Sequence, residues 1–385
     1  MDKVRKRVLV LFGGESCEHD ISIITGVLAL NCIDKELYSP VPVYITEDGW
    51  YTGEELFDLA FYKRRDVKGL ARVVTVFKSK ILYTLKGSKL KEVGEVYCAV
   101  NCCHGLNGED GSLAGVMRML GIPFASPDML SSSVCIDKTA TKIFLSGMDV
   151  KTLQYKVVTA SAFYKSREFV LSLAEKKIGY PCIVKPARLG SSIGISRASD
   201  RKELKEGIEL ALRYDGKIIV ERALDGFTEV NCAAYRSGSK INISECECPK
   251  ATGELLSFAD KYGNGVKHAL SRDFPAKIPT EISNKIKEIT GAVYRKLYVT
   301  GVIRIDFLLK DGEIYLNEIN TVPGSLALHL FKDKASDFNE VLTELIEEGV
   351  RSHREYLSST FTYSADVFSC VGNKNSGAKH STIKN

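Results

Sequence analysis

The chain has 385 residues, of which 44% are hydrophobic and 26% are charged, a composition typical of a globular protein with two or three domains. The formal net charge of +5 is small for this length, and no dense patch of Lys and Arg stands out. These features argue against nucleic-acid binding. No apolar stretch approaches the roughly 18 residues that a membrane span needs, so we expect none.

The eleven cysteines are scattered along the chain without the spacing of metal ligands. An unpaired number of scattered cysteines is typical of reduced, mostly structural thiols in a cytoplasmic protein. We therefore expect a cytoplasmic location and no disulfide framework.

The first third of the chain reads as a small α/β domain. Residues 7–12, 38–45 and 96–102 are short apolar runs typical of strands, and residues 21–33 have helical spacing. Basic residues before the first run resemble a signal peptide, but that run is short and ends at Gly13-Gly14, which favours a buried strand. We expect this domain, with parallel strands, to occupy residues 1–127.

The remainder reads as two further domains and a tail. A serine-rich stretch precedes a helix with Lys138 and Lys142, and strands are expected at 180–187 and 217–224. Strands then dominate, with helices at 282–297 and 335–357. We expect domains at 128–217 and 218–357. The polar, poorly patterned residues 358–385 indicate a flexible tail.

The stretch "RIDFLLKDGEIYLNEIN" predicts a hairpin with two facing acids. A loop of residues 311–313 would pair Lys310 with Ile314, Asp306 with Glu318, and Arg304 with Asn320. Alternation places the last four of these on one face, and Ile305, Phe307, Tyr315 and Ile319 on the other. Facing carboxylates repel each other, so a hard cation held by Asp306, Glu318 and Asn320 is one interpretation. The other is a solvated face on which Arg304 neutralises one acid.

Four further segments have polar residues at strand ends or in loops, and each has a plain structural alternative. "KPARLGSSIG" could cradle phosphate beside Lys185 or be a surface turn. "GGESCEHDIS" carries Glu18, a ligand-binding or helix-start residue. "NCCHGLNGEDG" carries His104, a functional or a structural histidine. "SFADKYGNG" carries Lys261 and Tyr262 on an active-site or an ordinary exposed loop.

Taken in order, these segments resemble the D-alanine–D-alanine ligases of the ATP-grasp superfamily, from about residue 7 to 330. The segments that carry the resemblance are "FGGESCEHDIS", "HGLNGEDGSLAGVMRMLGIPFASP", "IDK", "IVKPARLGSSIGIS", "VERALDGFTEV", "DKY", "RIDF" and "NEINTVPGS". The resemblance implies a three-domain ATP-grasp fold, α/β overall with α+β character in its ATP-grasp part. It also implies an ATP- and Mg²⁺-dependent ligase that joins two D-alanines through an acyl phosphate, for peptidoglycan precursor synthesis.

The resemblance also implies the nucleotide and metal ligands. Three lysines would hold the ATP phosphates, the third when its loop closes: Lys138, Lys185 and Lys261. The adenine would contact Glu221 and the backbone near Leu224, and the ribose would contact Glu229. Three residues would bind Mg²⁺, with Mn²⁺ as an alternative: Asp306, Glu318 and Asn320.

The amino-acid site is implied in the same way. Glu18, Ser191 and Tyr262 resemble a hydrogen-bonded trio, in which Glu18 also contacts the first substrate's ammonium and His104 lies by its carboxylate. Arg304 and the Gly324 amide would stabilise the oxyanion of the tetrahedral intermediate. Partners would be small amino-acid substrates, with no nucleic acid or membrane, and the family resemblance suggests a homodimer.

The chain departs from the family pattern after "NTVPG", where it continues "SLALHLFKD". His329 stands where the familiar ligases have a serine that contacts the second substrate's carboxylate, and Lys332 stands where they have a proline. We therefore expect Ser325 and His329 at the second-substrate site. The acceptor stays open between D-alanine, D-serine, D-lactate and another compound, as does a non-catalytic nucleotide-binding role.

Overall fold

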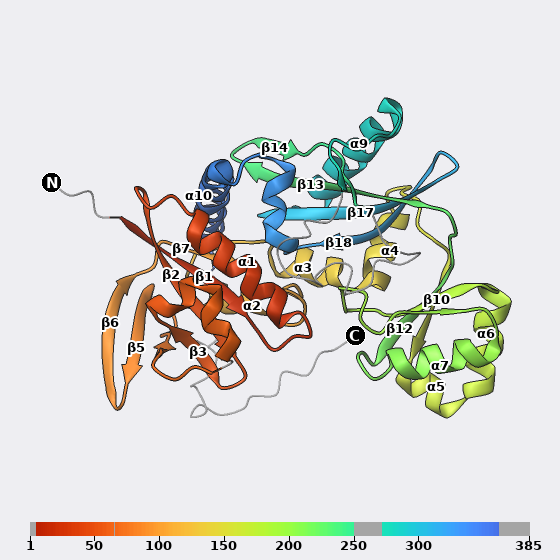
Figure 1. Cartoon of the computed structure of the whole chain (residues 1–385), viewed down its shortest axis with the longest axis horizontal. Coiled ribbons are helices and arrows are strands. Elements are labelled where there is room, and N and C mark those ends of the chain that lie inside the picture. The colour runs from red at the N-terminus through yellow and green to blue at the C-terminus, as the bar shows by residue number, and fades with distance from the viewer. Residues whose placement is uncertain (1–4, 65, 250–271, 362–385) are drawn as a thin grey trace, which may run out of the picture.

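The computed structural model describes residues 5–64, 66–249 and 272–361. Its elements build three main sheets, and the C-terminal sheet of β13, β14, β17 and β18 lies between the other two (Figure 1). Within the described ranges, no helix has both the length and the apolar composition needed to cross a membrane.

The N-terminal sheet has eight strands in the order β6-β5-β4-β3-β2-β1-β7-β8. Parallel pairing joins β2, β1, β7 and β8, and the other strands are antiparallel. The elements are β1 (Lys6–Gly13), α1 (His19–Cys32), β2 (Tyr38–Thr46), β3 (Gly49–Thr52), η1 (Glu54–Phe57), η2 (Leu59–Arg64), β4 (Ala71–Val74), β5 (Ile81–Lys86), β6 (Lys89–Glu95), β7 (Cys98–Asn101), α2 (Ser112–Leu120) and β8 (Phe124–Ala125). Six consecutive residues of β1 are buried, as in a parallel strand covered on both faces. The expected parallel strands are confirmed, whereas β3 to β6 were not predicted.

The central sheet is antiparallel, in the order β11-β10-β12-β9. The elements of this part of the chain are α3 (Met129–Ile136), α4 (Lys138–Ser146), β9 (Tyr155–Thr159), α5 (Ala160–Lys165), α6 (Arg167–Lys177), β10 (Cys182–Pro186), β11 (Ser196–Ala198), α7 (Arg201–Ala211) and β12 (Lys217–Arg222). A separate core of buried residues between positions 158 and 220 packs α5, α6 and α7 against this sheet. The loop between β10 and β11 carries Ser191, whose hydroxyl donates to Glu18 in the N-terminal part of the chain.

The C-terminal sheet is antiparallel, in the order β14-β13-β17-β18, and β15 and β16 form a small separate pair. Its elements are β13 (Thr228–Ser237), β14 (Lys240–Ile243), β15 (Cys248–Pro249), β16 (Arg272–Asp273), α9 (Thr280–Lys296), β17 (Val302–Lys310), β18 (Glu313–Asn320), η3 (Gly324–Leu330), η4 (Ala335–Asp337) and α10 (Phe338–Leu357). Cys135 of α3 and Leu145 of α4 belong to the same core as this sheet and α9. The opposite face of the sheet borders the candidate active site.

One core joins the two ends of the chain. Val8, Val10 and Phe12 of β1 pack in the same cluster as Leu342 and Leu345 of α10. The mixed α/β fold with a parallel N-terminal sheet is therefore confirmed, while the domain limits at residues 127, 217 and 357 stay a prediction. Most of the expected tail, residues 362–385, lies outside the described residues.

Candidate active site

Two cavities meet along the open face of the β17–β18 hairpin. The first, which we call the inter-sheet cavity, has a volume of 490 Å³ and lies between the central and C-terminal sheets. Its apolar lining includes Leu153, Ile183, Leu224, Phe227 and Leu308. Its polar lining includes Lys185, Glu221, Glu229, Asn317 and Glu318. A slot with apolar walls and charged groups at one end suits a nucleotide, with its base in the slot and its phosphates by the lysine.

A buried acid positions two lysines of the inter-sheet cavity. Glu221, at the end of β12, is 2% exposed, and its two oxygens lie 2.7 Å from Lys142 Nζ and 2.5 Å from Lys185 Nζ. Burial alone would raise the pKa of Glu221, but the two ammonium groups outweigh it and lower that pKa to about 2. Glu221 is therefore an anion that holds both lysine side chains at the cavity wall.

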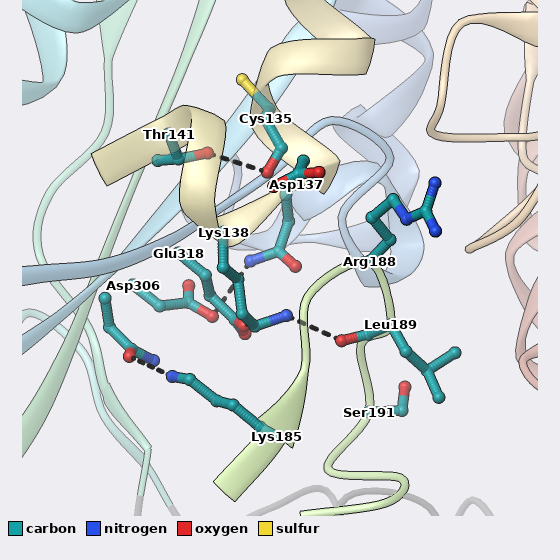
Figure 2. A network of polar contacts seen from close by, with 12 residues as sticks. Cys135, Asp137, Lys138, Thr141, Lys185, Arg188, Leu189, Ser191, Asp306 and Glu318 are labelled. Atoms are coloured by element: carbon teal, nitrogen blue, oxygen red, sulfur yellow. Dashed lines mark hydrogen bonds and ion pairs between the residues drawn. The ribbon is translucent and has the colours of Figure 1, made fainter. Parts of the chain in front are cut away.

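Lys138 reaches the same place from the start of α4. Asp137 caps this helix by accepting hydrogen bonds from the backbone N–H groups of Thr139 and Ala140, which fixes Lys138 in the first turn. The Lys138 ammonium donates to the Leu189 carbonyl at 2.7 Å and lies 3.8 Å from Glu318 Oε2 (Figure 2). Lys138 and Lys185 thus approach Glu318 from two different elements.

The β17–β18 register matches the prediction at the site but not at the turn. Asp306 faces Glu318 and Arg304 faces Asn320, as predicted. Near the turn, however, Lys310 pairs with Glu313, because the connection has two residues rather than three. A bulge between Asp306 and Phe307 restores the predicted register.

This bulge changes which side chains face the core. Phe307 pairs with Leu316, which is buried in the core, whereas Tyr315 pairs with Leu308 on the cavity side. The prediction that Tyr315 shares the face of Phe307 is therefore wrong. The extra residue is Asn317, whose Oδ1 accepts a hydrogen bond from Lys185 at 3.2 Å.

Asp306 is buried and bound by its own neighbours. Its two oxygens accept hydrogen bonds from Arg304 Nε and Nη2, each at 2.7 Å, and Oδ2 also accepts one from Asn320 Nδ2 at 3.0 Å. Because Asp306 is 2% exposed, the interpretation as a solvated face is wrong for this residue, although Arg304 does neutralise it.

The donor chemistry of the hairpin fits a hard divalent cation. Asp306, Glu318 and Asn320 offer carboxylate and amide oxygens that face one another across the two strands. The described residues contain no cluster of three or more His, Cys, Asp or Glu side chains that could hold a metal ion by themselves. A site here would thus rest on two acids, one amide and groups of the bound substrate, and Asp306 would share its oxygens with Arg304.

The second cavity, which we call the hairpin cavity, has a volume of 240 Å³ and lies on the N-terminal side of the hairpin. The predicted residues that line it are Glu18, His104, Lys138, Ser191, Glu229, Arg304, Glu318, Asn320, Gly324 and His329. Segments from all three parts of the chain therefore meet at one small, highly charged cavity.

Glu18 and Ser191 are in direct contact across the interface between the first and central sheets. The Ser191 hydroxyl donates a short hydrogen bond to Glu18 Oε1, and both residues are buried. Gly105 leaves the room that Glu18 needs, because a Cβ at this position, with φ of +70°, would lie 2.7 Å from Glu18 Oε2. Two of the three predicted trio members are thus brought together, while Tyr262 lies outside the described residues, as does Lys261.

His104 is a neutral imidazole next to this pair. It is 4% exposed, and its Nε2 lies 2.9 Å from the Thr25 hydroxyl. Burial lowers the pKa of His104 to about 4, and the nearby Arg304 cation acts in the same direction. His104 can therefore exchange hydrogen bonds with a ligand without adding positive charge near neutral pH.

Glu109 joins the loop after β7 to the loop after β18. Its oxygens accept hydrogen bonds from the backbone N–H groups of Gly105 at 2.9 Å and Val322 at 2.8 Å. Burial raises the pKa of Glu109, and the Glu18 carboxylate adds to this effect. Glu109 therefore holds two segments in a fixed relation: the loop that contains His104 and the segment that leads to Gly324.

The far end of the hairpin cavity contains His329, the acidic side chain of Glu247 and the basic side chain of Arg272. His329 Nε2 and Arg272 Nε each lie 3.4 Å from Oε1 of the buried Glu247. Gly324 also lines this end, whereas Ser325 does not. Instead, the Ser325 backbone N–H donates to the Thr25 hydroxyl at 3.2 Å.

The turn that carries these residues is strained. Residues 325–327 all have positive φ values, which for residues other than glycine costs about 1–2 kcal/mol each. Leu326, Ala327 and Leu328 are at most 3% exposed in the core shared with β1 and α10. Their burial holds the turn in this conformation and so orients His329 towards Glu247.

Four residues of the site were not predicted as site residues: Lys142, which contacts Glu221, and the cavity residues Glu109, Glu247 and Asn317. The spacing of Lys138 and Lys142 by four residues, which puts both on one helix face, was the available signal for Lys142. Glu109 stood inside a recognised segment without a role. Nothing local in the sequence indicates Glu247, or a bulge at Asn317.

A nucleotide-sized slot between two antiparallel sheets, with lysines at its end and a small charged cavity beyond, is the arrangement expected of an ATP-dependent ligase of the ATP-grasp class, and the family matches give that class. Comparison with known proteins is more specific. Residues 7–127 match the family profile "D-ala D-ala ligase N-terminus", and residues 144–347 match "D-ala D-ala ligase C-terminus". The chain belongs to the D-alanine–D-alanine ligase family.

Individual relatives are similar to this protein over most of its length. The D-alanine–D-alanine ligase of Thermosipho melanesiensis is 35% identical over 348 residues, which cover 90% of this chain and 94% of the relative. The structure of D-alanine–D-alanine ligase from Helicobacter pylori has a TM-score of 0.72 at 27% identity, and covers 89% of this chain and 98% of that one. The structure of a D-Ala:D-Ser ligase from Enterococcus faecalis has a TM-score of 0.71 at 26% identity, with coverage of 91% and 99%.

Proposed function

We propose that this protein uses ATP to join two D-alanines for peptidoglycan precursor synthesis. The carboxylate of the first would attack the γ-phosphorus, ADP would leave, and the amine of the second would attack the acyl phosphate and expel phosphate. One observation carries the proposal: Glu18, His104, Ser191 and Arg304 line one cavity that is joined through Glu318 to the phosphate-binding lysines. The family of the chain supports the same reaction.

In this reaction the lysines bind and orient ATP. Lys138 and Lys185 would contact the phosphates, with Lys261 added by its loop, while Glu221 and Asn317 keep Lys185 in place. The backbone near Leu224 would bind the adenine and Glu229 the ribose. Because Glu221 already binds Lys142 and Lys185, we infer that it acts mainly by positioning these two lysines. Its contact with the adenine would contribute less to ATP binding.

The hairpin would hold Mg²⁺ or Mn²⁺ with Asp306, Glu318 and Asn320. When bound, the metal would neutralise charge that develops on the phosphates. Around it, Arg304 orients Asp306 through two hydrogen bonds, and the Lys138 ammonium lies 3.8 Å from Glu318.

The first amino acid would lie between Glu18 and His104. Glu18 would accept a hydrogen bond from its ammonium, and Ser191 holds the Glu18 carboxylate in position. The neutral His104 would contact its carboxylate without a charge that weakens nucleophilic attack. Arg304, held by Asp306, and the Gly324 N–H would donate to the developing oxyanion. Tyr262 would complete the trio and keep water out.

A second candidate is a D-alanine–D-serine ligase. Its support is the polar acceptor end, where His329, Glu247 and Arg272 surround the space next to Gly324, together with the similar D-Ala:D-Ser ligase structure. A serine hydroxyl would find hydrogen-bond partners there that D-alanine does not use.

The decisive experiment is a substrate panel with ATP and Mg²⁺, read by phosphate release and by mass spectrometry of the product. We expect D-alanyl-D-alanine from D-alanine alone, and a mixed product at a lower rate when D-serine or D-lactate is added. Preferential capture of D-serine would support the second candidate. Turnover only with other compounds, or ATP binding by calorimetry without any turnover, would reject both.

Glu318→Gln provides the matched test of the hairpin. The change removes one negative charge from the cation site, so we expect kcat to fall at least about 100-fold while the unfolding free energy changes little. Glu313→Gln is the control, because Glu313 lies on the same strand but pairs with exposed Lys151 at the turn. Equal activity of the two variants would exclude the metal assignment.

The proposal extends to a homodimer in the cytoplasm, in line with the family resemblance. Light scattering after gel filtration measures the oligomeric state, and a monomeric mass would reject the dimer.

A further inference from the structure

Two buried cysteines face each other where residues 244–247, just before β15, run alongside β13. Asn231 and Glu247 exchange both backbone hydrogen bonds, at 2.8 and 2.9 Å, and Ser244 N–H donates to the Ala233 carbonyl at 2.9 Å. Between these contacts Cys232 faces two residues, Glu245 and Cys246, as in a β-bulge. Residues next to a hydrogen-bonded pair have Cα atoms about 4.5–5.5 Å apart, within the range that a disulfide requires.

Both side chains lie in the same buried core. Cys232 and Cys246 belong to the cluster that packs this sheet against α9, and they are 0% and 1% exposed. All ten cysteines within the described residues are free thiols. A bond between these two sulfurs would need only a small local movement.

The surroundings of Cys246 favour its thiolate. The hydrogen bond from Cys232 lowers the pKa of Cys246, and the Ser283 hydroxyl, 3.5 Å from the sulfur, acts in the same direction. The same contact raises the pKa of Cys232. Burial raises the pKa of seven other cysteine thiols instead: Cys32, Cys98, Cys102, Cys103, Cys135, Cys182 and Cys248. Cys246 also has the closer hydroxyl donor, Ser283 at 3.5 Å against Ser244 at 3.9 Å from Cys232, and we assign it as the attacking thiol.

This pair is attached directly to the acceptor end of the hairpin cavity. Glu247 follows Cys246, and its carboxylate contacts His329 and Arg272. Asn231 precedes Cys232 and pairs with Asp306 across the sheet. A bond between the sulfurs would turn the Cys246 side chain towards Cys232 and away from Ser283, and Glu247, the next residue, would shift with it.

We propose that Cys232 and Cys246 form a reversible disulfide that weakens binding of the second substrate. With a hydroperoxide as oxidant, the Cys246 thiolate attacks one peroxide oxygen, which gives a sulfenic acid and an alcohol or water. The Cys232 sulfur then attacks the sulfenic sulfur, the S–S bond forms and water leaves. Each thiol loses one hydrogen, and the peroxide takes up two electrons. A thiol reductant reverses the bond.

The covalent part of the test does not depend on activity. The reduced protein is treated with hydrogen peroxide, which is small enough to reach buried thiols, and is then digested without reduction. We expect a peptide pair linked through Cys232 and Cys246, an intact mass lower by two hydrogens, and recovery with dithiothreitol. Absence of this linkage, or overoxidation without it, would reject the proposal.

The kinetic part rests on the proposed function, so the reduced protein is first shown to release phosphate with D-alanine. If it does not, the proposed function fails while the mass result still stands. In an active preparation we expect oxidation to raise the KM of the second substrate at least about threefold, with the KM of ATP unchanged. An unchanged acceptor KM in the disulfide form would reject the coupling.

Cys246→Ala and Cys232→Ala should each prevent the linkage and the kinetic change. Cys248→Ala is the matched control, since Cys248 lies two residues beyond Cys246, in β15, and it should behave like the unaltered protein. Thermal unfolding establishes that each variant is folded before oxidation. Equal peroxide sensitivity in all three variants would exclude this pair as the responsive site.

Discussion

Glu221 shows how partners decide the charge of a buried residue. It is 2% exposed, yet it stays ionised because Lys142 and Lys185 each contact one of its oxygens. His104 is equally buried, but it has a cation, Arg304, as its charged neighbour and is held neutral. Burial alone would disfavour charge on both, so the neighbours, not the depth, set the difference.

Glu221→Gln leaves two buried lysines without their anion. We expect the unfolding free energy to fall by about 3–5 kcal/mol and the KM of ATP to rise about tenfold. Since the folded-state pKa of Glu221 is lowered to about 2, the stabilisation is present above its ordinary pKa and is lost as the pH falls towards 2.

Urea unfolding and ATP kinetics measure these effects. Glu206→Gln, an exposed change on α7, is the control and should leave both quantities unaltered. A Glu221→Gln variant with normal stability would contradict the buried three-residue ion network.

His104 predicts a pH dependence at milder acidity. Because burial and Arg304 lower its pKa to about 4, the unfolded chain binds a proton more readily than the folded one below its ordinary value of 6.5. The contribution of His104 to stability is therefore complete above that value and decreases as the pH falls towards 4.

Between about pH 7 and about pH 5, the wild type should lose about 2 kcal/mol more unfolding free energy than His104→Gln. Denaturant titrations of both proteins at the two pH values give this difference. Parallel losses would show that His104 is protonated in the fold.

At the scale of elements, the bulge in the β17–β18 hairpin decides which side chains line the two cavities. A two-residue turn alone would shift the pairing by one residue, because side chains alternate with a period of two. The extra Asn317 corrects this shift, so that Asp306 faces Glu318 and Leu316 enters the core. It also places its own amide against Lys185.

Asn317→Ala removes a hydrogen bond to a charged group without changing the strand length. We expect the KM of ATP to rise about tenfold, since such bonds contribute about 1.5 kcal/mol or more, while kcat changes little. Asn242→Ala, on the edge strand β14 of the same sheet, is the matched control. If both variants have the same ATP affinity, Asn317 does not position Lys185 for the nucleotide.

At the scale of the whole molecule, the first strand and the last helix of the described residues share one core. Leu342 of α10 is buried in the core that also contains Val8, Val10 and Phe12 of β1. The central sheet has a core of its own, to which Ile208 belongs. Hence the N-terminal sheet should depend on α10 more than on the central region.

The single tryptophan tests this relation, because Trp50 lies on β3 of the N-terminal sheet. Leu342→Ala should destabilise the unfolding transition seen by Trp50 fluorescence by about 2–5 kcal/mol. Ile208→Ala removes a comparable buried side chain from the central core and should shift this transition much less. Equal shifts would show that the whole chain unfolds as one cooperative unit.

Local patterns were enough for several parts of this protein. Apolar runs predicted β1, β2 and β7, and the alternation of "RIDFLLKDGEIYLNEIN" predicted that Asp306 faces Glu318. They succeed because burial and side-chain alternation act over a few consecutive residues. The strands between positions 49 and 95 were missed: β3 and β4 have only four residues each, and β6 is largely polar and exposed, so their patterns are weak.

The sequence by itself determined the family, through motifs whose order along the chain is specific, and therefore the expected chemistry of Glu18, His104 and Arg304. Only the tertiary structure decided that Lys142 supports Glu221, that Asn317 bulges towards Lys185, and that Glu247 reaches His329. Each of these contacts joins residues from different elements. Their distances depend on how whole sheets pack, and no local spacing in the chain encodes that packing.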